Sequence, residues 1–170
     1  MDKLYAPWRH DYVTGTARKE DKSKLKNECV FCHQFEQNED KKYFILKRYK
    51  RCAVMLNAYP YNAGHLLILP LEHEGELENL DSDTRNELME LVNLSIKVLK
   101  KILKPQGFNI GLNVGSAGGG GIPSHLHFHV LPRWNGDTNY LTTIGDTKVI
   151  CSDFYKVYDD LKKEFDKEEL

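Results

Sequence analysis

The chain has 170 residues, of which 41% are hydrophobic and 29% are charged, and its formal net charge is −1. The hydrophobic content predicts a folded domain rather than a disordered chain. The near-zero charge argues against bulk nucleic-acid binding, and the lack of an apolar run of about 20 residues argues against a membrane span. Because the N-terminus does not resemble a signal peptide, we expect a cytoplasmic protein.

We expect one domain over residues 1–170, with its core at about 29–151. The first apolar segment, residues 4–8, is expected to dock on the body. A polar, lysine-rich loop follows at 14–27, and its role is open. Short apolar runs then predict strands at 43–46, 53–56 and 65–69, the last of them ended by Pro70.

A long helix is predicted over residues 82–104, because apolar residues recur there at helical spacing after the N-cap residue Asp81 and before Pro105. Two more strands, at 108–114 and 126–131, and a short helix at 153–164 complete the order. Grouped strands with one long helix predict an α+β fold with an antiparallel sheet.

Residues 125–129 have the sequence His-Leu-His-Phe-His. On a strand the three imidazoles would share one face, while Leu126 and Phe128 would face a core. Imidazole can act as a nucleophile, a proton carrier or a metal ligand. The row could also arise by chance, or its three histidines could together hold a catalytic metal.

Four consecutive glycines, residues 118–121, precede this row. Their backbone N–H groups can approach an anion closely, although no Gly-Lys-Ser/Thr follows as in a Walker A loop. Phosphate held beside an imidazole favours in-line displacement at a nucleotide α-phosphate. In that reaction a neutral imidazole nitrogen attacks phosphorus and forms a phosphoramidate, which an acceptor then resolves. The sequence requires no metal at the phosphate.

The histidine row resembles the motif H-φ-H-φ-H-φ-φ of the histidine-triad family, where φ is an apolar residue. Three further segments, residues 57–65, 107–113 and 132–139, resemble the diadenosine tetraphosphate phosphorylase branch of this family, as do residues 4–8. The similarity extends over about residues 43–151. It implies the family's fold and, as the activity, cleavage of dinucleoside polyphosphates by phosphorolysis or hydrolysis.

The resemblance also implies roles for single residues. His127 is similar to the nucleophile, His129 to its partner at the phosphate or leaving group, and His65 to a supporting histidine. The implied substrate contacts are Asn57 at the ribose, Asn113 and Gly120 at the α-phosphate, and Trp134. Where the branch tends to have Ser, this chain has Gly121, which disfavours phosphorolysis. Apart from the resemblance, Asn57 and Asn113 could simply cap turns.

Three further expectations rest on this resemblance. The first is a two-fold homodimer, paired through the long helix. The second is an alternative activity, hydrolysis of adenosine phosphoramidates or other nucleotide conjugates. The third is that the molecule this protein binds is a nucleotide substrate. An alternative of another class is a nucleotide-binding signalling module with incidental turnover.

Cys29 and Cys32 form a C-x-x-C pair that His33 follows. This pattern could serve haem attachment, redox chemistry or metal binding. Some histidine-triad relatives, and galactose-1-phosphate uridylyltransferase, join such a pair to a downstream histidine and to the first histidine of the triad. The resemblance thus implies a structural zinc site formed by Cys29, Cys32, His73 and His125. The remaining cysteines, Cys52 and Cys151, are expected to be buried thiols.

Overall fold

The computed structural model describes residues 29–170, apart from the side chain of Thr143. The predicted docking of residues 4–8 and the loop at 14–27 lie outside the described residues. The elements, in chain order, are α2 (Val30–Glu36), β1 (Ile45–Arg48), β2 (Cys52–Leu56), β3 (Leu66–Pro70), the 3-10 turn η3 (Leu77–Asn79), α3 (Ser82–Leu103), β4 (Gly107–Leu112), β5 (Phe128–Arg133), α4 (Tyr140–Ile144) and α5 (Phe154–Phe165).

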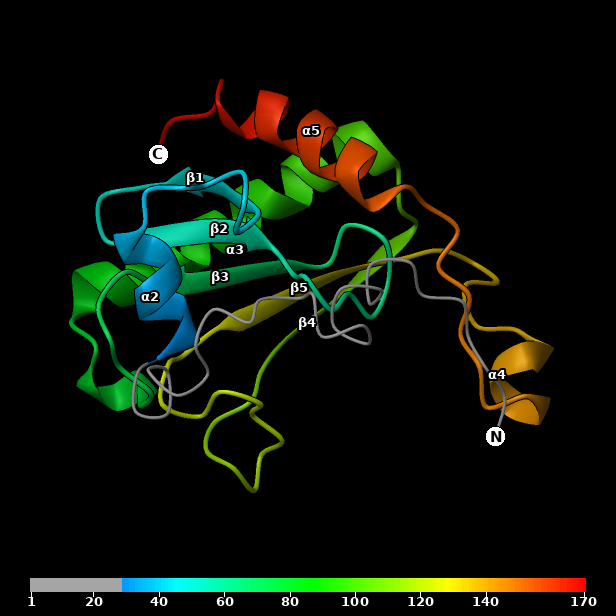
Figure 1. The fold of residues 1–170 in the computed structure, drawn as a ribbon, viewed down its shortest axis with the longest axis horizontal. Helices are drawn as coiled ribbons and strands as arrows, with labels where there is room; N and C mark the ends of the chain where they lie inside the picture. Colours follow the sequence, from blue (N-terminus) through cyan, green and yellow to red (C-terminus); the bar gives the residue numbers. More distant parts are fainter. Residues whose placement is uncertain (1–28) are drawn as a thin grey trace.

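The five strands form one antiparallel sheet in the order β1-β2-β3-β5-β4. Helix α2 covers one face of the sheet, and α3 with α5 covers the other (Figure 1). The interior strand β2 is buried along its whole length, because Val54 packs toward α3 while Ala53 and Met55 pack toward α2. The predicted α+β fold is confirmed.

The long helix α3 follows its sequence signals closely. The Asp81 side chain accepts a hydrogen bond of 2.7 Å from the Thr84 backbone N–H, which caps the first turn. Leu88, Leu91 and Leu99 are almost fully buried against the sheet. The helix ends at Leu103, and Lys104 follows in the left-handed conformation. The prediction of residues 82–104 is therefore confirmed to within one residue.

Strand boundaries and short helices differ from the predictions. Phe44 has a φ of +59°, so residues 43 and 44 belong to a turn, and β1 begins only at Ile45. Pro70 is the last residue of β3 and pairs with Cys52 instead of lying beyond the strand. The helices α2 and α4 were not predicted, because seven and five residues are too few for a periodic signal.

The connection between β2 and β3 packs tightly on the end of α3. Gly64 has a φ of +69°, and a Cβ atom there would lie 2.4 Å from Leu103 Cδ1. This contact fixes the chain just before His65, the first histidine of the candidate site. Within residues 29–170 no helix combines the length and apolar character needed to cross a membrane.

Candidate active site and metal centre

Three histidines converge on the α2 side of the sheet, where β3 and β5 lie side by side. His65 immediately precedes β3, His127 immediately precedes β5, and His129 lies within β5 opposite Leu67. The ring centroids of His65 and His129 are 5.1 Å apart, as are those of His127 and His129. Leu126 and Val130 pack in the core shared with α3, as the predicted alternation requires. The strand itself begins at Phe128 and ends at Arg133 instead of spanning 126–131, so only His129 of the three histidines in the row lies on β5.

Hydrogen bonds determine which ring nitrogens of His65 and His129 carry protons. The Tyr61 backbone N–H donates to His65 Nδ1 at 3.1 Å, so the proton of neutral His65 is on Nε2. His65 Nε2 then donates to His129 Nδ1 at 2.9 Å. The proton of neutral His129 is consequently on its own Nε2, a buried atom that has no partner among the described residues. The site thus presents an unused N–H donor.

Neutral His127 carries its proton on the other ring nitrogen, Nδ1, unlike His65 and His129. Its Nδ1 lies 2.8 Å from the carbonyl oxygen of His125, and a carbonyl can only accept, so Nδ1 carries the proton. The free lone pair of neutral His127 is therefore on Nε2. The residue is 8% exposed and packs beside Phe31 of α2, with ring centroids 5.4 Å apart. A lone pair and an N–H donor on adjacent rings are the groups that nucleophilic displacement at phosphorus needs.

Burial keeps the supporting histidines neutral. It lowers the pKa of His65 to about 3, and the neighbouring His129 adds to this effect. Burial, followed by the nearby His127, also lowers the pKa of His129. Because both rings stay uncharged at neutral pH, the chain of hydrogen bonds from Tyr61 through His65 to His129 is retained under ordinary conditions.

The other predicted substrate residues are placed at different distances from these rings. The Asn57 amide contacts His65 Nδ1 at 3.3 Å, and its Oδ1 accepts from the Tyr59 backbone N–H. Asn113, Gly120 and Gly121 belong to the loop between β4 and β5, where the Gly120 amide donates to the Gly115 carbonyl at 3.4 Å. Among the described residues no hydrogen bond joins Asn113, Gly120 or Gly121 to His127 or His129, so the role of these three residues at a phosphate stays a prediction.

Trp134 lies just beyond the other end of β5 and lines a separate cavity of about 260 Å³, together with Asn62 and Asp137. The Asp137 carboxylate, whose pKa is lowered chiefly by its hydrogen bonds from Arg133, also accepts from Asn62 and from the Trp134 backbone N–H. The structure therefore does not bring Trp134 together with the histidines, and its contact with substrate remains a prediction.

The four predicted metal ligands do come together, and their donor atoms lie within 4.8 Å of one another. His125 Nδ1 is 3.3 Å from Cys29 Sγ and 3.6 Å from Cys32 Sγ, and His73 Nδ1 is 3.3 Å from Cys32 Sγ. A tetrahedral zinc site with ordinary Zn–S and Zn–N bonds has sulfur–nitrogen edges of about 3.5 Å. The arrangement fits such an ion and could hold it without major rearrangement.

The surroundings of His125 also suit metal binding. Its Nε2–H donates to the Pro70 carbonyl at 2.9 Å, which leaves the Nδ1 lone pair directed toward the cysteines. Burial, with the adjacent Cys29, raises the pKa of Cys32 to about 11, and a bound cation would favour the thiolate instead. Cys52 is buried as expected, whereas the prediction for Cys151 was wrong, because this thiol is exposed on the segment before α5.

Two residues near the histidines were not singled out from the sequence. Phe31 belongs to the short helix α2 and packs against both His125 and His127. Tyr61 stacks on His129 and also contacts His65. Phe31 lies between the two cysteines of the C-x-x-C pair, and Tyr61 lies four residues before His65. Proximity in sequence to predicted site residues was the only signal that could have identified them.

Comparisons with known proteins agree with this geometry. The HIT domain family matches residues 37–136. An AP-4-A phosphorylase from Mycobacterium tuberculosis is 38% identical over 150 residues, which cover 88% of this chain and 77% of that protein. Adenylylsulfatase HINT3 from Arabidopsis thaliana is 31% identical over 121 residues, which cover 70% of this chain and 59% of that protein.

The fold is also shared with solved structures. A Zn-bound histidine triad family protein from Mycobacterium smegmatis superimposes with a TM-score of 0.67 at 23% identity, covering 84% of this chain and 98% of that chain. Diadenosine triphosphate hydrolase from Plasmodium falciparum superimposes with a TM-score of 0.61 at 18% identity, covering 75% and 79%. From its sequence match, its fold and its histidine motif, the chain belongs to the HIT, or histidine-triad, family of nucleotidyl hydrolases and transferases.

Proposed function

We propose that this protein cleaves dinucleoside polyphosphates such as diadenosine tetraphosphate at an α-phosphate, through a nucleotide bonded to His127 Nε2. The observation that carries the proposal is the pairing of the His127 Nε2 lone pair with the unpartnered Nε2–H of His129 on the neighbouring ring. One ring can attack phosphorus while the other donates to the departing oxygen.

The reaction has two steps. In the first, His127 Nε2 forms a bond to the α-phosphorus, and the bond from that phosphorus to the bridging oxygen breaks. The nucleoside triphosphate departs as an anion, and His129 Nε2–H donates a hydrogen bond to its leaving oxygen while keeping the proton. In the second, phosphate or water attacks the same phosphorus, the nitrogen–phosphorus bond breaks, and the proton of the attacking acceptor is released to solvent. The glycine loop, including Gly120 and Gly121, is proposed to lie against the phosphate oxygens. There the Gly120 N–H would exchange its 3.4 Å hydrogen bond to the Gly115 carbonyl for one to the phosphate.

The remaining site residues are proposed to bind substrate. We assign Asn57 to the ribose hydroxyls, Asn113 to the α-phosphate and Trp134 to a more distant part of the substrate. We also propose that Cys29, Cys32, His73 and His125 hold a structural zinc ion, and that this ion takes no part in the chemical steps. Because these ligands leave no open coordination position, zinc would stabilise the site without contacting the phosphate.

The assembly proposed here is a single domain that forms a homodimer through α3. Met89, on the surface of this helix, is 55% exposed and so is available for such a contact. The proposal of a dimer rests on the family, and the apolar side chain on α3 is consistent with it.

Product analysis tests the proposed activity. With diadenosine tetraphosphate and phosphate we expect ADP and ATP, as for a phosphorylase, because the M. tuberculosis relative bears that name. Without phosphate, water becomes the acceptor and we expect AMP and ATP. Chromatography of the nucleotides separates these outcomes. AMP in both conditions would indicate hydrolysis alone, which agrees with the presence of Gly121 where the phosphorylase branch tends to have Ser.

Two results would favour other functions. Rapid cleavage of adenosine phosphoramidate or adenylyl sulfate, with slow cleavage of the dinucleotide, would assign a nucleotide-conjugate hydrolase, an activity that the HINT3 relative supports. Tight binding of the dinucleotide without products would indicate a signalling module, and it would contradict the proposed catalytic role of His127.

A further inference from the structure

Tyr61 is an exposed aromatic residue at the candidate active site for which the chemistry above has no use. Its side chain is 59% exposed, although its ring stacks on His129 with centroids 5.9 Å apart and planes inclined by 17°. It also lies 4.8 Å from the His65 ring. One surface of the tyrosine ring thus covers the hydrogen-bonded histidine pair, and most of the rest is open to solvent.

Isolated exposed aromatic residues are common on protein surfaces and need no functional explanation. The position of Tyr61 is distinctive, because its ring covers His129, whose Nε2–H has no partner among the described residues. In the proposed reaction that N–H donates to the departing oxygen. The triphosphate chain that begins at the departing oxygen therefore starts close to Tyr61.

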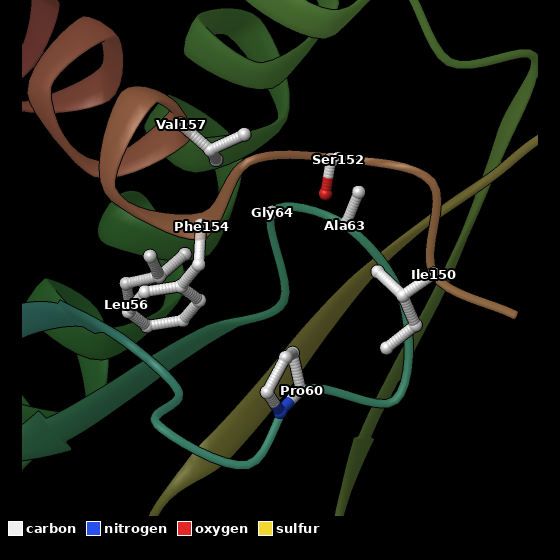
Figure 2. Close-up of a pocket in the computed structure, with 8 residues that line it drawn as sticks. All are labelled: Leu56, Pro60, Ala63, Gly64, Ile150, Ser152, Phe154 and Val157. Atoms are coloured by element: carbon white, nitrogen blue, oxygen red, sulfur yellow. The ribbon is translucent and has the colours of Figure 1, made fainter. Parts of the chain in front are cut away.

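The loop that carries Tyr61 packs against the C-terminal segment and the end of α3. Figure 2 shows Pro60, Ala63 and Gly64 of this loop facing Ile150 and Phe154 of the C-terminal segment across a small cavity. The cavity measures about 10 Å³, so it has room for no more than a water molecule. On the same side, Gly64 fits directly against Leu103. A ring on such a loop is already positioned before a ligand arrives.

We propose that Tyr61 is the binding site for the purine of the departing nucleotide, which stacks on the outer face of the phenol ring. The result is a stack of three rings, His129, Tyr61 and the base, that places the leaving oxygen near the His129 donor. The inference rests on the proposed function and adds to it a site for the second nucleoside.

Stacking requires a flat ring and not a hydroxyl group, which gives a clear set of variants. Tyr61→Ala removes the ring but retains the backbone N–H that fixes the tautomer of His65. Tyr61→Phe and Tyr61→Trp keep a ring. Tyr155→Ala is the matched control, because Tyr155 is a comparably exposed tyrosine, 62%, that packs on Phe44 of the opposite layer.

The test compares substrates with and without the second base. Diadenosine tetraphosphate has the second base. Adenosine 5′-tetraphosphate is the same molecule without the second adenosine. In adenosine 5′-phosphoramidate the leaving group is only ammonia. For Tyr61→Ala we expect kcat/KM on the dinucleotide to fall about tenfold, mainly through KM, since stacking of one base on an aromatic side chain has an effect of this order. Rates on the other two substrates should change by less than about twofold.

Tyr61→Phe, Tyr61→Trp and Tyr155→Ala should retain the rate on the dinucleotide. An equal loss on all three substrates would overturn the inference, because it would mean that the ring merely positions His129. An unchanged rate on the dinucleotide would overturn it as well. If the wild-type protein cleaved none of the three substrates, the proposed function itself would fail, a result distinct from failure of the base site alone.

Discussion

Substitution of His127 by Ala is expected to reduce cleavage of diadenosine tetraphosphate by on the order of 10⁴-fold or more, because loss of a covalent nucleophile removes the main reaction path. The His125 carbonyl fixes the proton of the neutral His127 ring on Nδ1, so the lone pair is on Nε2. Among the described residues no hydrogen-bond donor is directed at this Nε2 atom. Initial rates measured by nucleotide chromatography check the effect.

The control for this variant is His33→Ala. His33 lies on α2 and packs edge-on against Tyr43, outside the group of histidines proposed to act in catalysis or to bind metal. It should retain full activity. Both variants should show an unfolding transition close to that of the wild type, which separates loss of chemistry from loss of structure. A His127→Ala protein that kept more than about a tenth of the wild-type rate would exclude the proposed nucleophile.

The second large effect is expected at the metal centre. Purified protein should contain one zinc ion per chain, and Cys29→Ala should lose it. We expect that variant to be destabilised by about 3 kcal/mol or more, because zinc binding and folding are coupled. Cys29 immediately precedes α2, and through the ion it would tie this helix to His125, two residues before the proposed nucleophile His127. Metal analysis and denaturant unfolding provide the measurements.

Cys151→Ala provides the same chemical change at an exposed thiol outside the cluster, and it should keep both zinc and stability. Treatment of the wild-type protein with a strong chelator should reproduce the loss seen in Cys29→Ala. If Cys29→Ala bound zinc at one ion per chain, the four proposed ligands could not be the correct set.

The strongest sequence signals predicted the elements that carry the site. The periodic apolar face and the Asp81 cap located α3, and the alternation of histidine and apolar residues located the α2-facing side of β5. These signals are local, because they depend on how a helix or a strand presents successive side chains. The joining of Cys29, Cys32, His73 and His125 was predicted only through the family resemblance, since nothing local connects such distant residues.

Other features depend on contacts across the fold and were not predictable from local pattern. Helix α2 spans seven residues and is held by burial of Phe31 and Phe35 under the sheet rather than by its own periodicity. The stacking of Tyr61 on His129 requires the β2–β3 connection to curve over β5, which Gly64 permits. The distance of Trp134 from the histidines follows from its position past the far end of an extended strand.

The most direct test of the account is detection of the covalent nucleotide. Protein mixed with excess diadenosine tetraphosphate in the absence of phosphate is quenched during the first turnovers, digested and mapped by mass spectrometry. We expect an adenylate on the peptide that contains His127, stable in alkali and lost in acid, as is typical of a phosphorus–nitrogen bond. Products that accumulate while this peptide stays unmodified, or an adenylate on a different residue, would contradict it.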